Sequence, residues 1–198
     1  PVKGAADMAA YAAAGFDTFD MADHYGSAEV ITGELLNSPG GRGAAPVKAF
    51  TKWCPPPGAM TAEVVRAGVQ RSLDRMRTNR IDLMQFHWWT FEHPGWLDAL
   101  HELTRLRDEG LIGAIGLTNF DTAHLRVLLA EGVPIASNQV CISLLDRRAS
   151  ESMSALCLQH GVKLLAYGTL GGGFLSERWL GREQPAEVAD WSKMKYRR

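Results

Sequence analysis

Cysteine is scarce in this sequence. The 198 residues contain three, Cys54, Cys141 and Cys157, and no two of them form a CxxC pair. An odd, widely spaced set argues against a disulfide framework and is typical of a reducing compartment. The N-terminus shows no basic segment followed by an apolar one, and no apolar run is long enough to span a bilayer. We therefore expect a soluble, cytoplasmic protein.

An excess of charge of either sign is also missing. Lysine and arginine number 21 and acidic residues 22, which gives a net charge of −1. Such a balanced chain has no global electrostatic reason to bind nucleic acid or an anionic membrane, so we expect neither partner. The histidines other than His87 lack the spacing of metal ligands, so we expect no metal site.

A repeated unit organises the rest of the sequence. An apolar run is closed by a polar residue and is followed by a loop with glycine or proline and then by an amphipathic helix pattern. The runs start roughly 20 to 35 residues apart, the spacing of a strand, a helix and two loops. They are Phe16–Phe19, Val47–Thr51, Ile81–Phe86, Ile112–Leu117, Pro134–Ser137 and Val162–Ala166. We expect a single domain over residues 1–198, with the polar segment 176–198 as a long loop or tail.

Helix boundaries can be predicted for four of the segments between the runs. Thr61, Asp121 and Ser150 are suitable N-caps, and a further helix is expected between Pro94 and Gly110. Strands that alternate with helices imply parallel β/α units with right-handed crossovers.

Two parallel folds suit this alternation, an open doubly wound sheet and a closed barrel. The first strand of a dinucleotide-binding open sheet should run into a GxGxxG motif, which the sequence lacks. We therefore predict an α/β protein of the (β/α)8 TIM-barrel class. Such a barrel has eight strands and typically about 250 residues, and about six β/α units are visible here.

A polar or aromatic residue follows the apolar part of each expected strand. Active sites of β/α barrels assemble from residues at the carboxyl ends of the strands. Taken singly, each residue has a plain structural interpretation, such as a loop cap for the aspartate or a packing aromatic for the tyrosine. Their shared position on successive units favours one convergent site. The residues are Asp20, Lys52, His87, Asn119, Gln139 and Tyr167.

Several short stretches resemble the aldo-keto reductase family. GFDTFDMADHYG is similar to the signature of that family, in which an aspartate precedes a tyrosine by five residues, and this spacing selects Asp20 and Tyr25. FTKW resembles the lysine strand of the family and DLMQFHW its histidine strand. The resemblance therefore implies a catalytic set of Asp20, Tyr25, Lys52 and His87.

Further stretches, in the same order, resemble the cofactor-binding segments of the family. GLTNF is similar to the family's GVSNF, SNQV supplies the glutamine, and AYGTLGGGFL supplies a tyrosine followed by a glycine-rich loop. The resemblance implies NADP(H) as cofactor, with Asn119 and Gln139 holding the nicotinamide carboxamide and Tyr167 stacked on the ring. The implied cofactor-binding residues are Thr118, Asn119, Gln139, Tyr167, Gly168, Leu170, Gly171 and Gly172.

The implied activity is the reduction of a small aldehyde or ketone to an alcohol by hydride transfer. The alkoxide that forms needs a proton donor and electrostatic stabilisation. Tyrosine has an unperturbed pKa of about 10, and a neighbouring Lys52 is expected to lower the pKa of Tyr25. Tyr25 is thus the expected general acid, Asp20 the residue that holds Lys52, and His87 a hydrogen-bond donor to the carbonyl oxygen.

Two other functions stay open. A relative without catalytic activity would bind the nicotinamide cofactor and serve as a regulatory subunit, and a Schiff-base aldolase barrel would use Lys52 as its nucleophile. Three tryptophans next to the lysine and the histidine predict either an aromatic substrate wall or packing at the barrel rim. They are Trp53, Trp88 and Trp89.

The ends of the chain depart from the family pattern. A helix-like stretch, Asp7–Ala14, precedes the first strand, and nothing after Tyr167 resembles the last strand, whose basic residues contact the 2′-phosphate in the family. We expect the chain to be part of a longer protein that supplies the first and last strands. The choice of NADP(H) over NAD(H) is therefore implied by the family alone.

Overall fold

The computed structural model describes residues 1–39, 47–182, 194 and 196. Within them, six strands alternate with helices, and all strand pairs are parallel. The strands are β1 (Thr18–Asp20), β2 (Lys48–Trp53), β3 (Ile81–His87), β4 (Ile112–Thr118), β5 (Ile135–Cys141) and β6 (Lys163–Tyr167). The helices are α1 (Val2–Ala13), α2 (Ala28–Leu36), α3 (Ala62–Met76), α4 (Gly95–Asp108), α5 (Thr122–Ala130) and α6 (Ser152–His160). Each of the six apolar runs therefore overlaps a strand of the structure.

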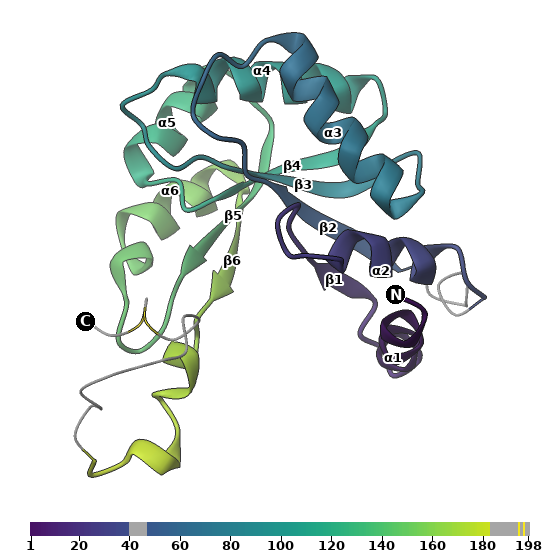
Figure 1. The fold of residues 1–198 in the computed structure, drawn as a ribbon. Helices are drawn as coiled ribbons and strands as arrows, with labels where there is room; N and C mark the ends of the chain where they lie inside the picture. The colour runs from purple at the N-terminus through teal and green to yellow at the C-terminus, as the bar shows by residue number, and fades with distance from the viewer. Residues whose placement is uncertain (40–46, 183–193, 195, 197–198) are drawn as a thin grey trace.

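The sheet has the order β1-β2-β3-β4-β5-β6, so each strand pairs with its neighbours in the sequence. It curls, and the helices lie along its outer side (Figure 1). Because the strands all run in one direction, their carboxyl ends meet along one rim. The register places His87 beside Thr118 and Thr118 beside Gln139 on three adjacent strands. The residues that close the strands therefore form a row.

Strand β5 continues to Cys141, well beyond the run Pro134–Ser137 that predicted it. The polar residues Ser137 and Asn138 gave the apolar run an early end, yet both are buried. Asn138 Nδ2 donates to the Phe120 carbonyl at 2.9 Å. A parallel strand covered on both faces accommodates an amide with such a partner.

Two of the predicted N-caps are confirmed and one is wrong. The side chains of Thr61 and Asp121 accept hydrogen bonds from the backbone N–H three residues later, at the starts of α3 and α5. Ser150 instead ends the 3₁₀ helix η1, Arg148–Ser150, and α6 begins after Glu151. The N–H of Ser150 donates to the Arg147 carbonyl at 2.9 Å within that turn, and Glu151 is the residue that precedes α6.

The main core lies between the sheet and the outer helices. In α4 the leucines recur at every third position, and Leu100, Leu103 and Leu106 are fully buried. They belong to one cluster with Phe86 and Ile115 of the central strands. Burying each such side chain contributes about 1.5–3 kcal/mol relative to leaving it exposed. This packing fixes the positions of the strand ends relative to one another.

The described chain between residues 168 and 182 is irregular. It forms two short 3₁₀ turns, η2 (Gly171–Gly173) and η3 (Glu177–Trp179), and no strand between residues 168 and 182. The predicted tail, 176–198, is thus irregular up to residue 182, and its residues 183–193, 195, 197 and 198 lie outside the described part. Among the described residues, no helix has the length and apolar character needed to cross a membrane.

Candidate active site

Lys52 and Asp20 form a close ion pair at the rim of the sheet. Lys52 Nζ lies 2.5 Å from Asp20 Oδ2 and also donates to the Met21 carbonyl at 3.0 Å. The lysine side chain is almost fully buried, whereas the aspartate is partly open to solvent. A buried ammonium group requires such a partner. The expected contact between Asp20 and Lys52 is confirmed.

Gln85 completes this network and was not among the predicted residues. Its side chain is fully buried, and Nε2 donates to Asp20 Oδ1 at 2.6 Å. Gln139 Nε2 lies within hydrogen-bond distance of both Asp20 Oδ2 (3.0 Å) and Gln85 Oε1 (3.1 Å), so residues of β1, β3 and β5 meet. The sequence did carry a signal, because Gln85 is a polar residue two positions before His87. That spacing places both side chains on one face of the strand.

Tyr25 lies on the loop after β1, and its ring centre is 5.6 Å from Lys52 Nζ. Its side chain is 52% exposed. The pKa of Tyr25 is raised above its ordinary value, first by burial and next by the negative charge of Asp20. The predicted net lowering of the Tyr25 pKa is therefore wrong. The ammonium is paired with Asp20, whose charge acts on Tyr25 in the opposite direction.

His87 closes β3 and lies beside Cys54, with 3.7 Å between Nδ1 and Sγ. Burial lowers the pKa of His87 to about 4, and the positive charges of His24 and Lys52 add to the effect. The imidazole is therefore neutral at neutral pH. Burial also raises the pKa of the Cys54 thiol to about 12, so the thiol stays protonated. The two groups form an uncharged pair.

The three tryptophans near the site divide into two kinds. Trp53 and Trp88 are each 3% exposed, and both rings contact Phe86 in the core. Packing therefore explains them. Trp89 is 59% exposed, and its ring centre lies 4.2 Å from that of His87. Of the three, Trp89 is the one with an open face beside the candidate site.

Asn119 and Tyr167 come together farther along the rim. The Tyr167 hydroxyl donates to Asn119 Oδ1 at 2.9 Å. Asn119 has a left-handed backbone, with φ of 58°, which asparagine adopts more readily than most residues. Thr118, directly before it, is buried, and its hydroxyl has no hydrogen-bond partner within the part of the chain that the structure describes.

The loop after β6 turns through glycines with left-handed backbone. Gly168, Gly171, Gly172 and Gly173 have φ of 67°, 57°, 64° and 95°. A side chain at these positions would strain the backbone, so the turn favours glycine. Backbone N–H groups in such turns can form a concave site for an anion. Leu170, within the loop, is 62% exposed.

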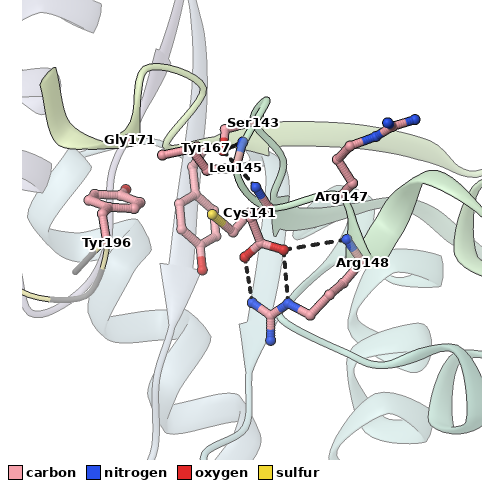
Figure 2. A pocket seen from close by; sticks show the side chains of 9 residues that line it. Cys141, Ser143, Leu145, Arg147, Arg148, Tyr167, Gly171 and Tyr196 are labelled. Carbon is pink, nitrogen blue, oxygen red and sulfur yellow. Dashed lines mark hydrogen bonds and ion pairs between the residues drawn. The ribbon is translucent and has the colours of Figure 1, made fainter. Parts of the chain in front are cut away.

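Two cavities of about 430 Å³ each lie next to Tyr167. The residues that line both are Cys141, Arg148 and Tyr167. One cavity, drawn in Figure 2, reaches Gly171, and the other reaches Asn119. Arg148 forms a bidentate ion pair with Asp146, with Nε at 2.8 Å and Nη2 at 2.6 Å from its carboxylate oxygens. This ion pair lowers the pKa of Asp146 to about 2. Of the predicted cofactor residues, Asn119, Tyr167 and Gly171 thus line these cavities.

Potential metal-ligating atoms of Asp23, His24 and Cys54 lie within 4.8 Å of one another. Protein contacts account for this grouping. Asp23 Oδ1 lies 3.0 Å from His24 Nδ1, and Oδ2 accepts from the Cys54 backbone N–H at 3.1 Å. A protonated thiol is also a poor ligand, because the thiolate is the form that binds metals. The expectation of no metal site stays a prediction.

A sequence model of the Aldo/keto reductase family matches residues 2–195. The chain belongs to the aldo/keto reductase family. Its structure resembles that of an aldo/keto reductase from Klebsiella pneumoniae, solved in complex with NADP and acetate. The TM-score is 0.74 and the identity 26%, over 86% of this chain and 59% of that one. The predicted barrel class is confirmed.

Two curated aldo/keto reductase relatives show how much of such a protein this sequence spans. An aldo-keto reductase of Mycobacterium sp. (strain JLS) is 33% identical, over 85% of this chain and 59% of its own length. The chloroplastic pyridoxal reductase of Arabidopsis thaliana is 27% identical, over 86% of this chain and 51% of its own length. The chain therefore spans about half to three fifths of the length of these relatives.

In this aldo/keto reductase chain, the predicted residues fall into two neighbouring groups. One surrounds Lys52 and contains the four predicted catalytic residues. The other surrounds Tyr167 and contains Asn119 and the glycine loop. Gln139 bonds to Asp20 and so joins the first group, although the resemblance implied a place in the second. The site residues that the motifs did not supply are Cys54, Gln85, Cys141 and Arg148.

Proposed function

We propose that the protein is an NADP(H)-dependent oxidoreductase that reduces an aldehyde or ketone to an alcohol. The observation that carries the proposal is the ion pair between the buried Lys52 ammonium and the partly exposed Asp20, with Tyr25 and His87 beside it at the rim. Burial of the Lys52 ammonium carries a desolvation penalty that its ion pair offsets only in part, which favours a functional reason for its position. Membership of the aldo/keto reductase family and the NADP bound by the Klebsiella relative support the same chemistry.

The residues around Tyr167 fit a nicotinamide dinucleotide. The unpartnered Thr118 hydroxyl and the Asn119 amide suit a carboxamide, and the Tyr167 ring borders both cavities. The left-handed glycine turns suit the phosphates because backbone without side chains can approach an anion closely, whereas the N–H of Gly171 itself donates to the Gly168 carbonyl at 2.8 Å. We assign to the nicotinamide the residues Thr118, Asn119, Gln139 and Tyr167. We assign to the phosphates the residues Gly168, Leu170, Gly171 and Gly172.

Tyr25 is the proton donor in this proposal. When bound, a reduced nicotinamide supplies the hydride to the carbonyl carbon. Tyr25 donates its hydroxyl proton to the carbonyl oxygen as negative charge develops there. The raised pKa keeps Tyr25 protonated at neutral pH, and the nearby Lys52 ammonium stabilises the tyrosinate left behind. Asp20 keeps that ammonium in place.

His87 orients the carbonyl through a hydrogen bond. Its low pKa keeps the imidazole neutral, so one ring nitrogen carries a proton and the other accepts. We assign the protonated Cys54 thiol as the donor to Nδ1, which leaves the ring proton on Nε2. The Nε2–H group then donates to the carbonyl oxygen and stabilises its developing charge.

The aldolase alternative finds little support in the position of Lys52. Its Nζ is buried and donates to Asp20 and to the Met21 carbonyl, which favours the charged ammonium. A Schiff base forms from the neutral amine instead. The alternative of a regulatory subunit differs from an enzyme in one respect, since it predicts cofactor binding without turnover.

The test is carbonyl reduction by the protein translated from its complete reading frame, with NADPH and NADH assayed in parallel. We expect cofactor oxidation that depends on an added aldehyde or ketone. Tyr25→Phe should lower kcat by about 10²–10⁴-fold at an unchanged cofactor Kd, whereas Tyr11→Phe, at an exposed tyrosine of α1, should have no effect. Near-normal rates for Tyr25→Phe would refute the role of Tyr25. Tight cofactor binding without turnover of any carbonyl would favour the regulatory subunit.

A further inference from the structure

Glu29 is a buried carboxylate outside the candidate active site. It lies in the first turn of α2 and is 2% exposed. Oε1 accepts a hydrogen bond from the buried Thr51 hydroxyl at 2.7 Å, and Oε2 accepts from Arg75 Nη1 at 3.1 Å. A charge buried this deeply is destabilising unless it is paired. No step of the proposed reaction uses it, so its position needs another explanation.

Arg75 links Glu29 to the loop that carries Tyr25. It belongs to the last turn of α3, and the same Nη1 atom also donates to the Asp23 carbonyl at 2.8 Å. Asp23 lies two residues before Tyr25. The planar guanidinium fixes its partners in direction as well as in distance. The contact with the carbonyl therefore restrains the loop.

The close approach of α2 and α3 holds this link in place. A Cβ atom at Gly33 would lie 2.8 Å from the Arg75 carbonyl oxygen and from Met76 Cα, so a side chain there does not fit without a shift of the backbone. Gly33 is one helical turn after Glu29, which places both residues on the face of α2 that meets α3. The backbone of Arg75 cannot recede from Glu29 without opening this contact.

Asp23 is also held by the strand that carries Lys52. The N–H of Asp23 donates to the Lys52 carbonyl at 2.9 Å, and its Oδ2 accepts from the Cys54 N–H at 3.1 Å. Thr51, the other partner of Glu29, directly precedes Lys52. The Glu29–Arg75 pair therefore connects the backbone around Lys52 with the loop before Tyr25.

We propose that the Glu29–Arg75 pair positions Tyr25 against Lys52, and so sets the geometry of proton transfer without touching the substrate. The inference rests on the proposed function, in which Tyr25 is the proton donor. A misplacement of about 1 Å in an active site costs on the order of 10²-fold in rate. Loss of the pair therefore lowers kcat through Tyr25 and leaves the residues around Tyr167 in place.

Two variants break the pair, and two others serve as matched controls. Glu29→Gln and Arg75→Gln each remove one charge. Glu34→Gln and Arg77→Gln break a 2.8 Å ion pair that joins the same two helices on the exposed surface. In the protein from the complete reading frame, we expect the first two variants to lower kcat by about 10- to 100-fold at an unchanged cofactor Kd. The two controls should keep the kcat of the wild type.

The pH profile separates positioning from a merely structural role. With Tyr25 displaced from the Lys52–Asp20 pair, the charges acting on its hydroxyl change, so the Tyr25 pKa and with it the basic limb of the kcat profile move away from those of the wild type. Arg75→Lys keeps the charge and should restore part of the rate. A lower melting temperature with unchanged kcat and pH profile would overturn the proposal, as would equal losses in the two control variants.

Thr51→Val keeps the experiment decisive if Glu29→Gln does not fold. It preserves the shape of the side chain and removes the hydroxyl that orients Glu29, so a smaller fall in kcat with the same shift in pH profile is expected. A readout without turnover is the NMR titration of the Tyr25 ring, which should shift in Thr51→Val or Glu29→Gln and not in Glu34→Gln. A wild-type protein that reduces no carbonyl would refute the proposed function, whereas an unshifted titration would refute the positioning role alone.

Discussion

The thiol of Cys54 lies 3.7 Å from Nδ1 of His87, at the ends of the neighbouring strands β2 and β3. Both groups are partly buried, and burial keeps both uncharged at neutral pH. In a neutral imidazole, the hydrogen bond made by one nitrogen decides which nitrogen carries the proton. The orientation of His87 is thus tied to a residue that no sequence motif singled out.

Replacement of Cys54 by valine should therefore impair turnover. A lost hydrogen bond is worth about 0.5–1.5 kcal/mol, so kcat should fall by about 2- to 10-fold. Cys54→Ser retains a donor and should keep more activity than Cys54→Val. Steady-state kinetics on both variants provide the measurement, with Cys157→Val in α6 as a control for the loss of a buried thiol. A valine variant as active as the serine variant would remove Cys54 from this role.

The lowered pKa of His87 predicts a pH-dependent contribution to stability. The unfolded chain takes up a proton here near the ordinary pKa of 6.5, whereas the folded protein does so only near pH 4. Between these values the unfolded state holds more protons, so the free energy of unfolding falls as the pH is lowered. Because glutamine does not titrate, the free energy of unfolding of His87→Gln should fall less over this pH range than that of the wild type. The measurement is the urea midpoint of each variant at about pH 7 and about pH 5, with His101→Gln as the control. If the midpoint of His87→Gln falls between these pH values as steeply as that of the wild type, the prediction is contradicted.

The exposed ring of Trp89 predicts a preference for aromatic carbonyl substrates. A planar substrate held at His87 would contact this ring, which is 59% exposed beside the imidazole. Loss of a ring contact costs about 0.5–1.5 kcal/mol, so Trp89→Ala should raise KM for benzaldehyde by about 2- to 10-fold. KM for a short aliphatic aldehyde should change less. Phe16→Ala, which removes an exposed ring before β1, is the control. If Trp89→Ala raises KM equally for both aldehydes, the substrate does not contact the Trp89 ring.

Tyr167 offers a ring and a hydroxyl, and two variants separate them. Tyr167→Ala should weaken NADPH binding by about 0.5–1.5 kcal/mol, the value of a lost stacking contact. Tyr167→Phe keeps the ring and loses the 2.9 Å hydrogen bond to Asn119, so its affinity should stay close to that of the wild type. Fluorescence titration of folded variants measures both. Unchanged affinity in Tyr167→Ala would exclude stacking, and equal losses in both variants would assign the effect to the hydroxyl.

The sequence by itself determined the order of the strands and the row of residues at their ends. Both follow from local patterns, because an apolar run with a polar residue after it encodes a strand and its carboxyl end within a few positions. Lys52, His87 and Asn119 could be placed on the rim in this way. The sequence also indicated the glycine loop after β6, since the need for left-handed backbone is a property of single residues.

The tertiary structure alone decided the contacts that no motif implied and the way the side chains titrate. Gln85 contacts Asp20 across 65 positions of sequence, and Arg75 contacts Glu29 across 46, distances at which no periodicity carries information. Local sequence could not predict the direction of the Tyr25 pKa shift either. It depends on burial and on the sum of the surrounding charges, and these exist only once β1 and β2 have brought Asp20 into contact with the lysine.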